Sequence, residues 1–494
     1  MASRLYPCRA ALLLFFLTVA SALSTKHCVI VGGGPVGYAT ALTLSSPPHC
    51  YNVTVLEKTS GATAVQTYDP TRAFLYNVNP RGLEWIEQHR RVMERLLDKG
   101  YSPESGMGTF VNVPAEPDKA IKTTSLRGDM ANKTFDQVKR SVWIARHQMV
   151  QILKDSCVEQ SAKGITSGND VGYIEICDGK TVTNVQQVED GTCLLVDCED
   201  GTSFPAQLVV AADGVDSAVR NCLSQPKPSS WLHSKAESFR MKKYITPSTG
   251  LRLKALQLPP DFQIPDENGI GQETTSTNIY FMESVNQGSK DIRLGLLPSK
   301  DPTLVRPANV VTRPDHELWS FRDGPSIKSY IQKSFPRFAW DTIIPDDAEW
   351  ERFAQAKGTS YPAAQYCPGI AVSSPTNPQV GVVLLGDATH AFAPDIGQGI
   401  NAGLNDVVAL DRCLRGQNVV SGESEGAPPK DLATALAIYE QDRAREHKAL
   451  IRLARFGARK SSDPAIEIIM CCNKHLPHDS FSLSSVSIST SMVA

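Results

Sequence analysis

The first apolar positions of the chain form short continuous runs separated by a stretch with helical spacing. Cys28–Val31 is an apolar run, a glycine turn follows it, and helical spacing extends from Pro35 through Leu44. A second run, NVTVLE, ends at Glu57. Short apolar runs bounded by turns predict buried strands. This order predicts a βαβ unit at the start of the folded chain.

Helical and strand-like segments then follow one another. Two segments with helical spacing, at 83–97 and 146–158, predict amphipathic helices. The runs at 173–177, 193–198 and 207–214 predict strands, with a turn at 199–201 after the second.

The second half of the chain changes character twice. Broken β-like runs separated by proline-rich and polar loops fill 228–345 and predict a separate β-rich layer. Residues 380–387 return to the pattern of a buried strand. Two helices are expected after it, from Gly399 to Leu414 and from Leu432 to Phe456, before a serine-rich tail that starts at Ser461 and is expected to be loose.

Composition excludes several classes of protein. The 494 residues are 41% apolar and 21% charged, with a formal net charge of -2. That balance offers no basic field for nucleic acid, and we expect no nucleic-acid partner. The cysteines do not have metal-ligand spacing, so no metal site is predicted.

The N-terminus has the order of a secretory signal peptide. Arg4 and Arg9 precede an apolar stretch from Ala10 to Ala20, and Ala20-Ser21-Ala22 fits an A-x-A cleavage site. We therefore expect residues 1–22 to direct the chain into the secretory pathway, to the endoplasmic reticulum or outside the cell. Two alternatives stay open: a membrane anchor through residues 10–22, which would be the chain's only membrane contact, and a plastid-targeting sequence.

The glycine turn carries a dinucleotide-binding pattern. Gly32-x-Gly34-x-x-Gly37 follows a predicted strand and opens a helix at Pro35 and Val36. In this context the glycines allow a tight turn, close approach of a pyrophosphate and close packing of helix on strand. Glu57 ends the second strand, 20 residues after Gly37, where its carboxylate can bind a ribose diol.

Two acidic motifs end later strands. Asp213-Gly214 closes the 207–214 run, and Gly386-Asp387 closes the 380–387 run. Ligands of open α/β sheets bind outside the carboxyl ends of the strands. Both carboxylates are therefore expected to reach the same dinucleotide as the glycine turn.

One glycine fingerprint, a DG motif and a GD motif in this order resemble the FAD-dependent aromatic hydroxylases over most of 27–455. The resemblance implies an α/β fold, with a Rossmann-like FAD-binding domain, an interleaved β-rich substrate layer and C-terminal helices. The FAD-binding domain would comprise 27–227 and 346–460, with the substrate layer at 228–345 and the loose tail at 461–494.

The same resemblance assigns roles within the FAD site. Glu57 would bind the adenosine ribose, and Asp387 would hold the ribityl chain. Asp213 and Gly214 would lie near the pyrophosphate and the approach of NAD(P)H. A further group would surround or approach the isoalloxazine ring: Arg146, Pro394, Gly397, Gln398, Gly399, Ile400 and Asn401.

Within this family the sequence is most similar to the kynurenine 3-monooxygenases. The stretch from Arg72 to Gly82 and the run from Gly397 to Gly403 carry this similarity. The arginine expected to bind the substrate carboxylate is missing, because 101–114 contains no Arg or Lys. Arg72, which is also a candidate for the cofactor, and Arg81 are the proposed substitutes, and Asn401 is a third candidate for substrate contact.

The expected function is an FAD-dependent monooxygenase that uses NAD(P)H and O2 to hydroxylate a small aromatic substrate. In such enzymes the cofactor performs the difficult chemistry, so no catalytic side chain is assigned. His390 is the nearest titratable group, and a hydrogen-bonding or packing role is favoured for it. A flavin-dependent halogenase or reductase on the same fold, and a flavin-binding sensor or scaffold without turnover, remain as alternatives.

Overall fold

The structure is a computed structural model, and it describes residues 26–60, 75–102, 109–125, 141–167, 171–189, 191–227, 230–265, 271–394, 397–417 and 431–457. Residues 1–25 and 458–494, with the expected signal peptide and tail, lie outside the described residues.

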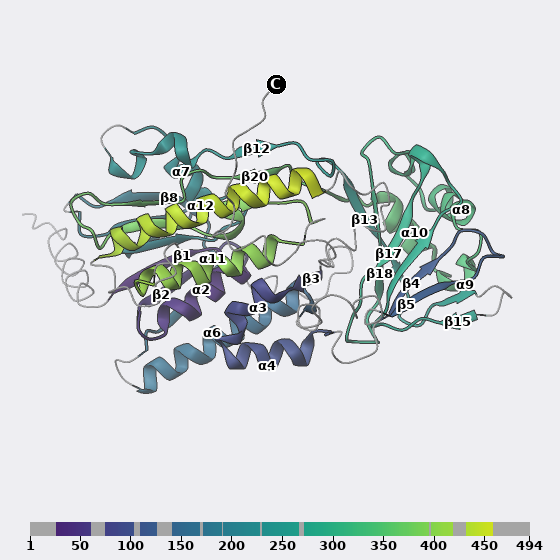
Figure 1. The fold of residues 1–494 in the computed structure, drawn as a ribbon, viewed down its shortest axis with the longest axis horizontal. Coiled ribbons are helices and arrows are strands. Elements are labelled where there is room, and N and C mark those ends of the chain that lie inside the picture. The colour runs from purple at the N-terminus through teal and green to yellow at the C-terminus, as the bar shows by residue number, and fades with distance from the viewer. Residues whose placement is uncertain are drawn as a thin grey trace, which may run out of the picture.

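A six-stranded sheet forms the centre of one half of the molecule, here called the cofactor half (Figure 1). Its order is β21 (Ala371–Ser373), β22 (Gly381–Leu384), β11 (Leu208–Ala211), β1 (His27–Val31), β2 (Asn52–Glu57) and β7 (Ile174–Asp178). All neighbours are parallel except β21 and β22. Ile30 pairs with Val55 and Val210, and none of the three is exposed. The predicted βαβ unit is confirmed, and continuous apolar runs become strands buried on both faces.

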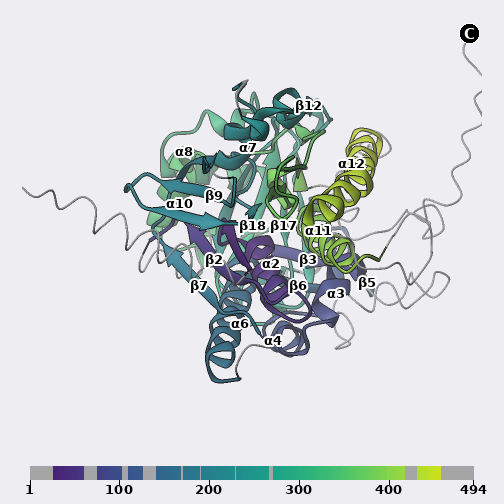
Figure 2. The same ribbon diagram turned by 90° about the vertical axis from the view of Figure 1, so that its left-hand side faces the viewer.

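Helices pack around this sheet and against one another. They are α2 (Pro35–Ser45), α3 (Pro80–Glu87), α4 (Arg90–Lys99), α6 (Arg146–Ser167), α7 (Ala218–Leu223), α11 (Gly399–Leu414) and α12 (Leu432–Gly457). Figures 1 and 2 show α12 lying alongside α11, which also contacts α2 and α3.

The single helix expected at 83–97 is wrong, because the structure has two helices there. α3 begins earlier, with the Asn79 side chain accepting the backbone N–H of Arg81. The chain breaks at His89, whose backbone is not helical and whose ring stacks on Trp85 at 4.0 Å. This local stacking replaces a turn of helix that the apolar spacing alone would continue.

Small sheets complete the cofactor half. One contains β8 (Val182–Gln187), β9 (Leu194–Cys198) and β10 (Ser203–Ala206), and its β9–β10 hairpin confirms the turn predicted at 199–201. Another pairs β3 (Leu75–Val78) with β6 (Val142–Ala145). A third contains β12 (Lys242–Tyr244), β20 (Ala364–Tyr366) and β23 (His390–Ala391).

The short 3-10 helices of the described residues, in both halves, are Trp231–His233, Ala236–Phe239, Gly288–Lys290, Glu317–Trp319 and Gly386–Ala388.

The other half is the β-rich layer, a seven-stranded sheet with helices on one face (Figure 1). Its order is β19 (Thr359–Ser360), β13 (Arg252–Leu258), β18 (Arg306–Thr312), β17 (Arg293–Leu296), β16 (Ile279–Glu283), β4 (Thr109–Val113) and β5 (Lys122–Ser125). The helices α8 (Gly324–Ser334), α9 (Trp340–Ile343) and α10 (Asp347–Gln355) share its apolar core. A separate pair is β14 (Gln263–Pro265) with β15 (Gly271–Glu273).

The layer differs from the range 228–345 predicted for it. β4 and β5 join it from earlier in the chain, and α10 and β19 join it from later. β12 instead pairs with β20 in the cofactor half. Strand pairing between distant segments, here β4 with β16, leaves no local signal in the sequence.

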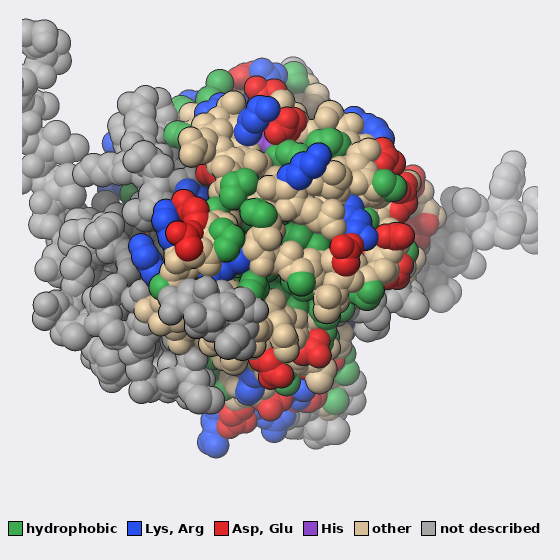
Figure 3. Space-filling model, turned by 90° about the vertical axis from the view of Figure 1, so that its right-hand side faces the viewer, with side chains coloured by type: hydrophobic (Ala, Val, Ile, Leu, Met, Phe, Trp, Pro, Cys, Tyr) green, Lys and Arg blue, Asp and Glu red, His purple; other side chains and the backbone are tan. Residues whose placement is uncertain are grey.

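The described residues on the outer face of the β-rich layer carry charges of both signs. Figure 3 shows Lys and Arg interspersed with Asp and Glu there. Among the described residues, no helix is both long enough and apolar enough to cross a bilayer.

Candidate functional site

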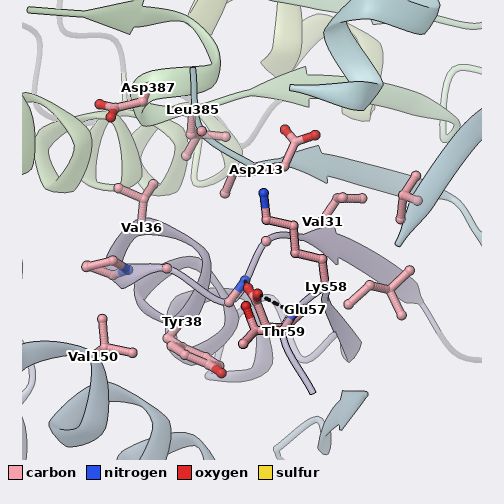
Figure 4. A pocket seen from close by; sticks show the side chains of 18 of the residues that line it. Val31, Val36, Tyr38, Glu57, Lys58, Thr59, Val150, Asp213, Leu385 and Asp387 are labelled. Atoms are coloured by element: carbon pink, nitrogen blue, oxygen red, sulfur yellow. Dashed lines mark hydrogen bonds between the residues drawn. The ribbon is translucent and has the colours of Figure 1, made fainter. Parts of the chain in front are cut away.

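A cavity of about 570 Å³ lies where the carboxyl ends of β1, β2, β7 and β11 meet. This volume is typical of a small-molecule site. Figure 4 shows Asp213, Leu385 and Asp387 on one side of the glycine turn and Tyr38 and Val150 on the other. The predicted residues that line it are Gly32, Gly34, Pro35, Val36, Glu57, Arg146, Asp213, Gly214, Asp387, Gly399 and Ile400.

The glycine fingerprint packs directly against the DG motif. Gly32 has a φ of +106°, and a Cβ there would lie 2.4 Å from the carbonyl oxygen of Ala212, just before Asp213. A Cβ on Gly37 would lie 1.9 Å from the carbonyl oxygen of Gly32. Gly37 therefore packs closely against the turn, and it does not itself line the cavity.

Gly34 behaves differently, because a Cβ there would meet no atom within 4 Å. It lines the cavity and stands at the N-terminus of α2, where no side chain caps the helix. The first N–H groups of a helix lack intrahelical partners and attract anions. The N-terminus of α2 therefore combines open space at Gly34 with N–H groups that can donate to an anion.

Glu57 is held at the end of β2 by two backbone groups. One carboxylate oxygen accepts the N–H of Gly33 at 2.7 Å, and the other accepts the N–H of Thr59 at 2.8 Å (Figure 4). The carboxylate therefore lies next to the glycine turn, within the cavity.

Asp213 presents one satisfied and one unsatisfied oxygen. Oδ2 accepts the N–H of Ala218 at 2.7 Å, whereas Oδ1 is buried and has no partner. Burial raises the pKa of this carboxyl, and the hydrogen bond from Ser217 opposes the rise. Because this oxygen is enclosed by protein, Asp213 contributes to the cavity wall and holds the start of α7.

The GD motif reaches the cavity from the neighbouring strand. Gly386 has a φ of +60°, and a Cβ there would lie 3.0 Å from the side chain of Val36. Arg220, from α7, donates to the carbonyl oxygen of Ala388 at 2.9 Å and so links the DG segment to this turn. The three motifs found in the sequence therefore form one structural unit.

Asp387 is accessible from the cavity although protein surrounds it. This enclosure raises its pKa, while the nearby His390 and Arg146 lower it. Arg146, the first residue of α6, hydrogen-bonds the hydroxyl of Tyr76. The prediction placed Arg146 near the ring system but missed Tyr76, which the β3–β6 pairing brings alongside.

Other cavity residues were also missed. They include Tyr38, Lys58, Lys154, Asp178 and Lys180. Asp178 ends β7 directly beside Glu57 and pairs with Lys154 at 2.8 Å. Its place at a strand end is a signal that the sequence offered, but no motif marks it.

The segment before α11 contributes in two ways. Gly399 and Ile400 line the cavity, whereas Pro394, Gly397 and Gln398 lie outside its lining. Asn401 is fully buried: its amide donates to the carbonyl oxygens of Asn77 and Gly397, each at 2.9 Å, and its Oδ1 accepts the N–H of Asn79. The expected contact of Asn401 with substrate is therefore corrected to a role in joining β3 to this segment.

Arg81 is likewise engaged inside the protein. It forms an ion pair with Glu446 and donates to Gln398 at 3.2 Å. It does not line the cavity, and its guanidinium is engaged by these partners, so its expected role as a substrate cation stays a prediction. Arg72 lies outside the described residues.

His390 belongs to a buried cluster with Asp406 and His447. Both histidines contact Asp406 through Nε2, at 2.7 and 2.9 Å, and Arg443 donates to the same carboxylate at 2.6 and 2.9 Å. A guanidinium in this position repels a metal cation, and the carboxylate oxygens already have their donors. The cluster is a hydrogen-bonded network and supports the packing role favoured for His390.

The residues of the cavity fit FAD. The open Gly34 and the uncapped N-terminus of α2 suit a diphosphate, and Glu57 suits a ribose diol. The accessible carboxylate of Asp387 offers a further acceptor, and Asp213 lines the cavity beside the glycine turn.

Comparison with known proteins agrees with this geometry. A family model described as FAD binding domain matches residues 25–290, more than half of the chain, and the chain belongs to this family. The expected FAD cofactor and aromatic-hydroxylase fold are confirmed.

Its relatives are flavin enzymes. A kynurenine 3-monooxygenase of Cryptococcus neoformans var. neoformans serotype D is 24% identical over 440 residues, which is 87% of this chain and 77% of the relative. The FAD-dependent monooxygenase olcE of Penicillium canescens is 24% identical over 341 residues, 68% of this chain and 63% of the relative. A solved 2-methyl-3-hydroxypyridine-5-carboxylic acid oxygenase has a TM-score of 0.57 at 17% identity, covering 92% of this chain and 95% of that one. The prediction of an FAD-dependent aromatic monooxygenase is thus confirmed at the level of the family.

Proposed function

We propose that this protein uses FAD, NAD(P)H and O2 to hydroxylate a small aromatic acid, and that kynurenine is the first substrate to test. The observation that carries the proposal is the convergence of the glycine fingerprint, Asp213 and Asp387 on one cavity. The Cryptococcus neoformans relative, matched over most of both chains, supports the choice of kynurenine.

The side chains of the cavity bind and orient the cofactor. The N-terminus of α2 would hold the diphosphate, Glu57 the adenosine ribose and Asp387 the ribityl chain. Gly399 leaves room for the ring system, because a Cβ there would meet no atom within 4 Å. FAD, when reduced by NAD(P)H, supplies the chemistry that transfers one oxygen atom of O2 to an aromatic ring.

The β-rich layer would supply the substrate wall. One face of its sheet packs on α8–α10, and the other turns toward the cofactor half (Figure 1). Strand register places Asn112, Phe281, Gly295, Asn309 and Ala255 in one row on this second face. Phe281 lies 5.0 Å from Phe110 between ring centroids, and Asn112 donates to Glu283 at 3.1 Å.

This wall suits an aromatic ring with polar substituents. Phe110 is partly exposed and offers an apolar surface for the ring, with the buried Phe281 packed behind it, and Asn112 and Asn309 offer hydrogen bonds at its edge. Exclusion of water by such a wall favours oxygen transfer over wasteful consumption of NAD(P)H.

The direct test is a coupled assay on the purified FAD protein. Kynurenine should accelerate the oxidation of NADPH or NADH, and the product should be one oxygen atom heavier. Acceleration without an oxygenated product would indicate an effector or a reductase, and a chlorinated product in the presence of halide would indicate a halogenase. A panel of neutral phenols and other aromatic acids serves as the comparison.

We also propose that residues 1–22 direct the protein into the secretory pathway. The order of Arg4, the apolar stretch and the A-x-A site supports it. A reporter fused to residues 1–30 should enter the endoplasmic reticulum and lose the segment. A reporter that stays in the cytosol would contradict the proposal, and one in a plastid would favour the alternative.

A further inference from the structure

Helix α12 carries a buried arginine whose three guanidinium nitrogens all donate hydrogen bonds. Arg443 is 1% exposed, and its Nε and Nη2 donate to Oδ1 of Asp406 at 2.9 and 2.6 Å. Its Nη1 donates to Asn405 at 3.0 Å and also pairs with Glu446. Arginine is rarely buried without such partners. Two series of contacts connect Arg443 to segments at the cofactor cavity.

The first direction ends at the GD motif. Oδ2 of Asp406 accepts the backbone N–H of Gly386 at 2.8 Å. Gly386 directly precedes Asp387, whose carboxylate lines the cavity. Arg443, together with His390 and His447, therefore holds the carboxylate that fixes the backbone presenting Asp387.

The second direction ends at the start of α11. Glu446 pairs with both Arg443 and Arg81, and Arg81 donates to the Gln398 side chain at 3.2 Å. Gln398 is the N-cap residue of α11, and the next two residues line the cavity. One arginine is thus connected to both segments that meet the cofactor from the side of α11.

The charges of this network alternate. Asp406 and Glu446 are acidic, and Arg443 and Arg81 are basic, so each charge of the network has an opposite neighbour, and Asp406 and Arg443 are the buried pair. His390 and the Arg443 guanidinium hold the pKa of Asp406 well below its usual range despite burial. Burial lowers the pKa of His447 to about 4, so that this ring is neutral at pH 7. Removing one member would leave its partner unpaired in the interior.

The other end of α11 has a cluster of the same residue types. Asp411 contacts His49 at 2.7 Å and accepts two bonds from Arg415 at 2.9 Å. His49 follows α2 at the end away from the glycine turn, and none of the three residues lines the cavity. This Asp411 cluster stabilises the same helix without a route to the cofactor.

From this difference we propose that Arg443 is a positioning residue, which through Asp406 and Glu446 sets the two segments, Gly386–Asp387 and Gln398–Ile400, that receive the flavin. The inference rests on FAD binding alone and not on the identity of the substrate. α12 lies outside the matched residues 25–290, yet it would determine how well the cofactor is held.

Four variants test it on the purified holoenzyme. Arg443→Met removes the guanidinium at the centre of the network. Arg443→Lys keeps the positive charge but not the three nitrogen donors of the guanidinium. Glu446→Gln breaks only the second route, at a pair in which Arg81 and Glu446 are 32% and 24% exposed, so this variant is expected to fold. Arg415→Met, in the Asp411 cluster, is the matched control. The measurements are the FAD dissociation constant, the visible spectrum of bound FAD and the melting temperature.

Arg443→Met should raise the FAD dissociation constant about tenfold or more, which corresponds to one charge-assisted hydrogen bond, and should shift the visible spectrum. Arg443→Lys should recover part of the loss, and Glu446→Gln should give a smaller shift in the same direction. Arg415→Met should lower the melting temperature with an unchanged dissociation constant.

Equal changes in the dissociation constant for the Arg443 and Arg415 variants would overturn the inference, because the network would then be only structural. If Arg443→Met does not fold, Glu446→Gln decides, and a dissociation constant and spectrum like those of the parent protein would overturn the inference. Failure of the parent protein to hydroxylate any aromatic would contradict the proposed function and leave this comparison intact.

Discussion

The two halves of the molecule present their functional residues in different ways. In the cofactor half these residues lie at the ends of parallel strands. The glycine turn, Glu57 and Asp213 converge there on one cavity, and each belongs to or adjoins a sequence motif. The β-rich layer presents a sheet face, where Asn112, Phe281 and Asn309 come from distant strands. In the proposed function the strand ends bind FAD, and the sheet face contacts the aromatic substrate. Changes in the two halves should therefore have separable effects.

The largest expected effect is loss of the cofactor on Gly34→Val. The added side chain would extend into the open space next to the N-terminus of α2. The variant should fold, as circular dichroism would show, yet be purified without the visible absorption of FAD. Gly34→Ala, with a smaller side chain, should lose less. Full FAD retention in the valine variant would contradict the assigned site.

A change in the layer should alter stability and leave FAD binding intact. Lys254 is 3% exposed, lies 4.4 Å from the ring centre of Phe353 and 5.0 Å from that of Trp319, and donates to the Phe353 carbonyl oxygen at 3.1 Å. Burial, together with Arg252, Arg322 and Arg352, lowers the pKa of Lys254 to about 7. Lys254→Met should stabilise the protein at pH 6, because it removes a buried positive charge that lies near other positive charges.

The pH dependence follows from the direction of this shift. The unfolded chain binds more protons than the folded protein between pH 7 and the ordinary lysine pKa, so the parent protein gains stability as the pH rises through that range. The advantage of Lys254→Met should therefore shrink from pH 6 to pH 9 in urea unfolding of the holoenzyme. An advantage that is the same at every pH would contradict the assigned burial.

A smaller effect on FAD is expected from Asp387→Ala. The variant keeps the glycine turn but loses an acceptor of the ribityl chain, which should raise the FAD dissociation constant about tenfold in fluorescence titration. Asp387→Asn, which keeps one acceptor oxygen, should lose less. Unchanged affinity in both variants would remove Asp387 from the site.

The smallest effect is expected from Asn309→Leu in the layer. It should raise the KM for the aromatic substrate several-fold, since it removes one hydrogen-bonding group from the proposed wall, at roughly 1 kcal/mol. The FAD dissociation constant should stay the same. A change in FAD affinity with an unchanged KM would reverse the assignment of the two halves.

The residues predicted from the sequence are those near strand ends. Gly32, Glu57, Asp213 and Asp387 each follow a continuous apolar run, and the geometry of a parallel sheet brings such ends together. Tyr76 was missed because it reaches the cavity only through the pairing of β3 with β6. The substrate role given to Asn401 was wrong because a sequence pattern cannot show whether a polar side chain faces a cavity or a buried partner.

The extent of the layer could not be predicted for the same physical reason. β4 pairs with β16, which lies far along the chain, and its five residues resemble any short strand. The two routes from Arg443 depend on the packing of α12 against α11, which helical spacing does not specify.

We propose above all that this FAD protein transfers oxygen to an aromatic acid. The purified holoenzyme should be incubated with NADPH, kynurenine and isotopically labelled O2, and the product analysed by mass spectrometry. We expect one labelled oxygen atom on the aromatic ring and NADPH oxidation that depends on the aromatic. Labelled hydrogen peroxide alone, with every aromatic acid tested recovered unchanged, would contradict it.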